Sequence, residues 1–120
     1  LEAARRFFAG LLAESAPDRE HLWVAHVDDD ARCIHLSRHD GSRAGADVPL
    51  RQILLDAAAH GSSGLVLAHN HPSGDPTPSA TDTALTRRLA LLGEAIDVAL
   101  LDHLVLAGGQ CRSMRAMGLL

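Results

Sequence analysis

The side chains best suited to bind a metal ion lie in residues 69–82, which read HNHPSGDPTPSATD. His69 and His71 are two residues apart, so at the end of a strand both imidazoles point to the same side and can reach one ion. Asp82 adds a carboxylate after a proline-rich loop. Two neutral imidazoles and one carboxylate leave an open position for water on a zinc ion, as a catalytic site requires. The spacing therefore predicts a zinc site with His69, His71 and Asp82 as ligands.

The complete pattern is far more specific than the histidine pair. With eight histidines among 120 residues, about 0.5 His-x-His pairs are expected by chance. Requiring Pro72, Ser79 and Asp82 at their offsets as well lowers this expectation to about 10⁻⁴. The prolines at positions 72, 76 and 78 stiffen the loop. The loop is expected to return the chain so that Asp82 faces the histidines from the first turn of a helix.

Ser79 and Asp82 also fit a purely structural role. The Ser-x-x-Asp spacing before an apolar-periodic segment is nearly a capping box, in which both side chains stabilise the start of a helix. The two roles are compatible, because a residue in the first turn can serve both the helix and the metal. Asp75 is an alternative carboxylate ligand if the loop folds back within four residues of His71.

The remaining histidines belong to no recognisable motif. His103, which follows Asp102, is expected to form a buried hydrogen-bonded pair that supports the site. The other five are expected at the surface or satisfied in the core: His21, His26, His35, His39 and His60. Cys33 is expected to be a small core hydrophobe on a strand. Arg87 and Arg88 are expected on the solvated face of their helix.

Residues 67–82, LAHNHPSGDPTPSATD, resemble the JAMM metalloproteases of the JAB/MPN fold, and most closely the bacterial RadC-like proteins. The resemblance extends over residues 20–106 and includes the pairs Glu20-His21 and Asp102-His103. It implies a zinc-dependent metallohydrolase, a peptidase or isopeptidase that acts on a protein or peptide substrate. It also implies a mixed β-sheet flanked by helices, in layers like those of the cytidine deaminases.

Two catalytic roles come from this resemblance. Family members have a glutamate at the start of the first strand that holds the reacting water and acts as general base, and Glu20 matches its position. Their serine before the helix that carries the aspartate stabilises the tetrahedral oxyanion, and Ser79 matches it. Without the resemblance, Glu20 reads as a solvated acid near a strand, with Glu14 and Asp18 as competitors for the role.

The sequence also departs from full-length RadC-like proteins. It does not contain their N-terminal helix-hairpin-helix region, and residues 39–47 match poorly. It opens at Leu1 rather than at a methionine, so we expect a piece of a longer protein. The RadC name suggests a second hypothesis, a non-catalytic JAB-fold interaction domain linked to DNA repair, but the intact ligand set favours the metallohydrolase. The sequence motifs of zinc deaminases, zincins and phosphate-binding loops are absent.

Segments around the motif alternate between strands and helices, which indicates an α/β layer structure in a single domain of residues 1–120. Strands are expected over residues 21–27, 32–36, 65–68 and 97–106, and around residue 111. Helices are expected over residues 1–15, 49–60 and 79–93. In the last of these, residues 84, 85, 89 and 92 are expected to face the core. The first two strands read as a hairpin, so the sheet is expected to be mixed.

Composition restricts the partners. The chain is 47% hydrophobic and 22% charged, as in globular proteins. No apolar run reaches the ~18 residues that a membrane span needs. Eleven basic residues, all arginine, against fifteen acidic ones give a net charge of −4. Direct DNA binding is therefore expected to be no tighter than about 10⁻⁴ M at physiological salt, unless folding gathers Arg5, Arg6, Arg87 and Arg88 on one face.

The cysteines and the first residues bear on location. Cys33 and Cys111 have no CxxC partner, which predicts free thiols and a reducing, cytoplasmic compartment. Residues 5–13 mimic a short signal peptide. The same segment favours a surface helix packed on a core, because its apolar residues recur at helical spacing at Leu1, Ala4, Phe8, Leu11 and Leu12.

Overall fold

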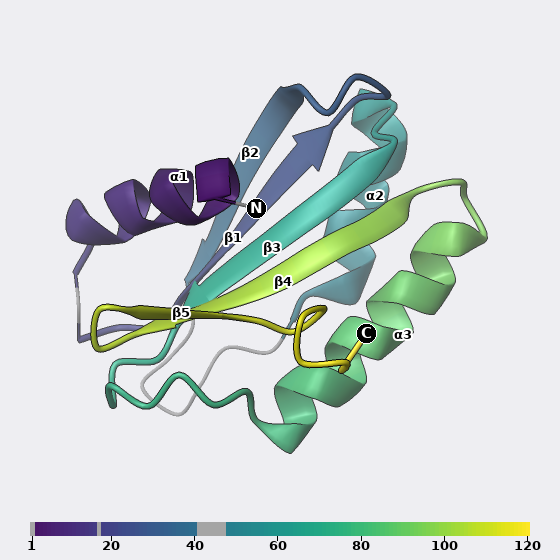
Figure 1. The fold of residues 1–120 in the computed structure, drawn as a ribbon. Coiled ribbons are helices and arrows are strands. Elements are labelled where there is room, and N and C mark those ends of the chain that lie inside the picture. Colours follow the sequence, from purple (N-terminus) through teal and green to yellow (C-terminus); the bar gives the residue numbers. More distant parts are fainter. Residues whose placement is uncertain (1, 17, 41–47) are drawn as a thin grey trace.

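The computed structural model describes residues 2–16, 18–40 and 48–120 (Figure 1). Its elements alternate as the sequence predicts. In chain order they are α1 (Glu2–Ala13), β1 (His21–Val27), β2 (Cys33–Asp40), α2 (Leu50–His60), β3 (Gly64–Asn70), α3 (Ala80–Glu94), β4 (Ala99–Ala107) and β5 (Gln110–Ser113).

The five strands form one mixed sheet, which confirms the predicted fold class. Their order is β2-β1-β3-β4-β5. β1 pairs antiparallel with both β2 and β3, whereas β3 and β4 are parallel. A parallel pair needs a crossover connection, and α3 provides it. β1 is buried along its whole length because it has a strand on each side and helices over both faces.

Helices cover both faces of the sheet (Figure 1). α2 and α3 pack on one face, where Ile53 and Leu89 join Leu67 in one apolar cluster. α1 packs on the opposite face, where the fully buried Phe8 contacts a second cluster that includes Trp23. The arginine pairs of α1 and α3 therefore lie on opposite sides of the sheet and do not form one basic surface.

Edge strand β2 differs from the expectations. It continues to Asp40, beyond the expected end at residue 36, while residues 41–47 lie outside the described residues. The prediction that Cys33 is a core residue is wrong, because Cys33 is exposed. The reason is its position: β2 has only one neighbouring strand, and its side chains alternate between exposed and half-buried. Both cysteines are free thiols, as expected.

The buried face of α3 also differs from the prediction. Positions 84 and 92 are exposed, and the buried residues are Asp82, Thr86, Leu89 and Gly93. Gly93 sets this rotation, because a Cβ at that position would lie 2.6 Å from the carbonyl oxygen of Val98. The helix therefore turns its glycine toward the following strand and its first-turn aspartate toward the sheet.

β4 begins at Ala99, two residues later than predicted. Asp97 has a left-handed φ of 61°, which is incompatible with a strand.

Among the helices that the structure describes, none is long and apolar enough to cross a membrane.

Candidate metal centre at the start of β1 and the end of β3

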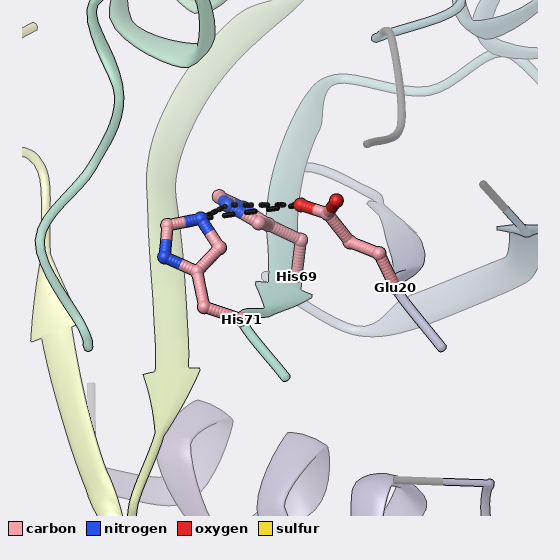
Figure 2. A group of neighbouring side chains, drawn as sticks. All are labelled: Glu20, His69 and His71. Atoms are coloured by element: carbon pink, nitrogen blue, oxygen red, sulfur yellow. Dashed lines mark hydrogen bonds and ion pairs between the residues drawn. The ribbon is translucent and has the colours of Figure 1, made fainter. Parts of the chain in front are cut away.

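The sheet brings the predicted site residues together although they are far apart in sequence. Leu22 of β1 pairs with His69 of β3, so Glu20, just before β1, lies next to the histidines. The first turn of α3 brings Asp82 to the same place. Figure 2 shows Glu20, His69 and His71 with their polar ends pointing toward one another.

The facing atoms lie close to one another. The Nε2 atoms of His69 and His71 are 2.8 Å apart. The Oδ2 atom of Asp82 is 3.3 Å from each of them. The Oε1 atom of Glu20 is 3.9 Å from each (Figure 2). One carboxylate oxygen of Asp82 and two imidazole nitrogens thus converge on a single point, with a second carboxylate beside them.

This arrangement fits a zinc ion. Ligands about 2.0–2.1 Å from a tetrahedral zinc ion lie about 3.3 Å from each other, which is the separation between Asp82 and the two histidines. The two histidine nitrogens are 2.8 Å apart, somewhat closer than this separation. Glu20, His69 and His71 also offer three ligand atoms within 4.8 Å of one another. Asp82 and Glu20 therefore each bring a carboxylate close to the histidine nitrogens, and the carboxylate of Asp82 is the nearer.

Asp82 is held in its ionised form. Burial acts to raise the pKa of Asp82, but hydrogen bonds from His69 and Ser79 and the charge of His69 outweigh burial and hold the pKa well below its usual range. Ser79 also completes the predicted capping box: Asp82 N–H donates to Ser79 Oγ over 2.9 Å, and Ser79 N–H donates to Asp82 Oδ2 over 3.2 Å. The cap therefore fixes the carboxylate that faces the histidines.

A second layer of hydrogen bonds orients the two histidines. His69 Nδ1 lies 2.6 Å from Nε2 of His103, whose Nδ1 lies 2.8 Å from Thr86 Oγ1. His103 is fully buried, and this burial is the main reason that its pKa lies well below its usual range. A neutral imidazole has one donor and one acceptor nitrogen, so His103 Nε2 can accept a hydrogen bond from His69 Nδ1–H, which leaves Nε2 of His69 bare for a metal. His103 forms the supporting buried pair that the sequence predicts.

The loop after β3 orients His71. Nδ1 of His71 lies 2.9 Å from the backbone oxygen of Asp75, to which it can donate, so that Nε2 faces His69. The carboxylate of Asp75 instead accepts a hydrogen bond from Thr77 N–H and is exposed. The loop thus folds back toward His71, as a ligand role for Asp75 would require. It brings the backbone carbonyl of Asp75 to His71, however, and not the carboxylate. The structure therefore favours Asp82 over Asp75 as the carboxylate at the site.

Asn70 has a role that the sequence pattern did not indicate. Its Oδ1 accepts a hydrogen bond from His21 N–H over 2.6 Å, and its Nδ2 donates to the Arg19 carbonyl over 2.8 Å. These contacts bracket Glu20 on both sides along the backbone. A signal was available, because Asn70 lies between the two histidines and must point to the opposite face of the strand. Buried Asn70 thus positions Glu20 beside the histidines.

Other residues that the sequence singled out stay outside this site. His21 is buried and satisfied, with Nδ1 2.8 Å from Asp40 Oδ1 and Nε2 2.9 Å from the Ala16 carbonyl. Arg87 and Arg88 are exposed, as expected. The Asp102 carboxylate holds the C-terminal turn by accepting hydrogen bonds from the Ser113 hydroxyl and the Arg115 backbone.

A mixed sheet flanked by helices, with this cluster at the ends of its central strands, is the arrangement that the resemblance implied. Comparison with protein families agrees, because the family described as RadC-like JAB domain matches residues 1–119. The chain therefore belongs to the RadC-like JAB domain family.

Curated relatives extend this assignment. The chain is 34% identical over 110 residues to a UPF0758 protein of Chloroflexus aurantiacus, covering 91% of this chain and 48% of the relative. It is 35% identical over 121 residues to one of Symbiobacterium thermophilum, with 98% and 50% covered. A UPF0758 protein of Bordetella petrii is 36% identical over 121 residues, with 98% and 52% covered. The chain thus spans about half the length of these relatives.

Proposed function

We propose that this domain is a zinc-dependent hydrolase of amide bonds, in a peptide or an isopeptide linkage. The observation that carries the proposal is the convergence of His69, His71 and Asp82 within 3.3 Å, with Glu20 beside them. Zinc, when bound by these side chains, supplies a Lewis acid that polarises a carbonyl and lowers the pKa of water to about 7.

In this proposal Glu20 moves the proton. Its Oε1 atom lies 3.9 Å from both histidine nitrogens, beside the proposed position of the ion and its water. In the proposed reaction Glu20 removes a proton from that water as the new C–O bond forms. It then delivers the proton to the amine as the C–N bond breaks, so one carboxylate serves as base and then as acid. Asn70 keeps Glu20 in place through the two backbone contacts described above.

Ser79 is proposed to stabilise the oxyanion. Its Oγ atom accepts the Asp82 N–H hydrogen bond, and a hydroxyl that accepts one bond can still donate its own proton. Ser79 is exposed at the edge of the cluster, where a substrate carbonyl can approach. A donor aimed at the oxygen that becomes negative stabilises the transition state more than the substrate.

We expect the substitution Ser79→Ala to retain zinc and to lower the hydrolysis rate by roughly 10²- to 10³-fold, as loss of an oxyanion donor does. It also removes the helix cap, which costs about 1 kcal/mol of unfolding free energy. Ser79→Asp is the matched control, because aspartate caps helices well but has no hydroxyl proton. Rates, zinc content and thermal unfolding of both variants separate the two roles. Full activity in Ser79→Asp would show that Ser79 is only a cap.

We propose a protein or peptide substrate, and not a nucleic acid. The net charge of −4 and the opposite placement of the two arginine pairs support this choice. The two free thiols support a reducing, cytoplasmic location.

The proposed activity can be tested with a mixture of peptides and lysine-linked isopeptides. We expect the zinc-loaded domain to generate new amino groups, detected by mass spectrometry, and the chelated protein to generate none. Addition of zinc to the chelated protein should restore cleavage. If the fully loaded domain cleaves none of these amides, the non-catalytic interaction domain linked to DNA repair becomes the better hypothesis.

A further inference from the structure

A second group of histidine and aspartate side chains lies at the other end of β1. His26 of β1 pairs across the sheet with His35 of β2. Asp56 of α2 lies over them, and one ligand atom from each of the three residues lies within 4.8 Å of the others. His26 is four residues along β1 from Leu22, the partner of His69. At about 3.3 Å per residue the two clusters are about 13 Å apart, too far to share one ion.

His26 has one nitrogen without a partner. Its side chain is fully buried, and its Nδ1 lies 2.8 Å from the Ser62 hydroxyl oxygen. Its Nε2 has no hydrogen-bond partner among residues 2–16, 18–40 and 48–120. Buried polar atoms nearly always have a partner, so an unpartnered nitrogen in a cluster of possible ligands indicates a missing one. This also corrects the expectation that His26 is satisfied in the core.

We propose that His26, His35 and Asp56 form a second binding site for a divalent transition metal ion of the zinc type. Two imidazoles and a carboxylate are a ligand set that zinc accepts, with a fourth position left for water. Because Ser62 engages Nδ1 of His26, Nε2 is the nitrogen left for the ion.

The surroundings of the three residues suit this role. A metal-binding histidine usually has its other ring nitrogen hydrogen-bonded, and the contact between His26 and Ser62 provides this. The His35 ring stacks on the His60 ring, with centroids 3.9 Å apart and planes 16° apart, which fixes its orientation. Gln52 Nε2 donates to Asp56 Oδ1 over 2.8 Å and holds that carboxylate.

The test measures zinc bound by the full chain, without a histidine tag, and cobalt binding by its visible absorption. We expect two ions per wild-type chain. His35→Asn and Asp56→Asn should each lose one ion, and both positions are only half-buried, so the fold should survive. Ser62→Ala, which removes the orienting contact of His26, should weaken binding at this site by about 10- to 100-fold. His39→Asn is the matched control, on the same strand but outside the cluster, and should keep both ions.

The variant His71→Ala isolates the second site. It should keep one ion, and excess zinc should raise its melting temperature, whereas His71→Ala combined with His35→Asn should show neither effect. Loss of all zinc in His71→Ala, or equal losses in His35→Asn and His39→Asn, would overturn the proposal. A wild type with one ion that is lost in His35→Asn and kept in His71→Ala would support this site and refute the first one.

Discussion

Replacement of His71 by alanine is expected to remove the zinc ion from the site that it forms with His69 and Asp82. A site with three protein ligands tolerates the loss of one poorly, because the remaining two no longer offset the cost of stripping water from the ion. His69→Ala and Asp82→Ala should have the same effect. Zinc content after dialysis against a buffered zinc solution measures the loss as about one ion per chain.

Asp75→Ala is the control for this series. Its carboxylate lies in the same loop but turns away from the histidines to bond Thr77, so zinc content should not change. Of the three ligand variants, His71→Ala disturbs the structure least. Loss of the His69 side chain leaves the buried His103 without its partner, and loss of the Asp82 carboxylate removes half of the capping box of α3. Unchanged zinc content in all three would refute the assignment of the site.

The substitution Glu20→Gln is expected to keep the zinc and to lower hydrolysis by about 10²- to 10⁴-fold, the usual contribution of a general base. Glutamine keeps the shape of the side chain but cannot accept the proton of the attacking water. The peptide assay described above, together with zinc content, measures both effects in the same preparation.

Glu14→Gln serves as the matched control for Glu20→Gln. Glu14 is exposed just after α1, and its substitution should leave both activity and zinc content unchanged. A different outcome would reassign the roles: if Glu20→Gln lost the zinc, Glu20 would be a ligand. The cluster of Glu20, His69 and His71 is compact enough to allow that arrangement.

Sequence order alone determined the features that depend on residues close together in the chain. The His-x-His spacing at a strand end and the Ser79-Asp82 capping box are both local, because strand alternation and the first helical turn fix the relative directions of these side chains. The alternation of strand and helix segments likewise predicted an α/β layer structure, and the hairpin of the first two strands predicted a mixed sheet. Such local features can be predicted from the sequence because they do not depend on how distant segments of the chain pack.

Tertiary structure decided everything that depends on strand register and helix rotation. Asn70 brackets Glu20 only because β1 pairs with β3, and His103 reaches His69 only because β4 lies beside β3. Close packing at Gly93 turned α3 so that positions 84 and 92 face outward, against the apolar pattern. The cluster of His26, His35 and Asp56 joins two strands and a helix, and none of its members stands in a motif. Such contacts arise between segments whose relative placement is set by the packing of the whole domain, which a linear pattern does not encode.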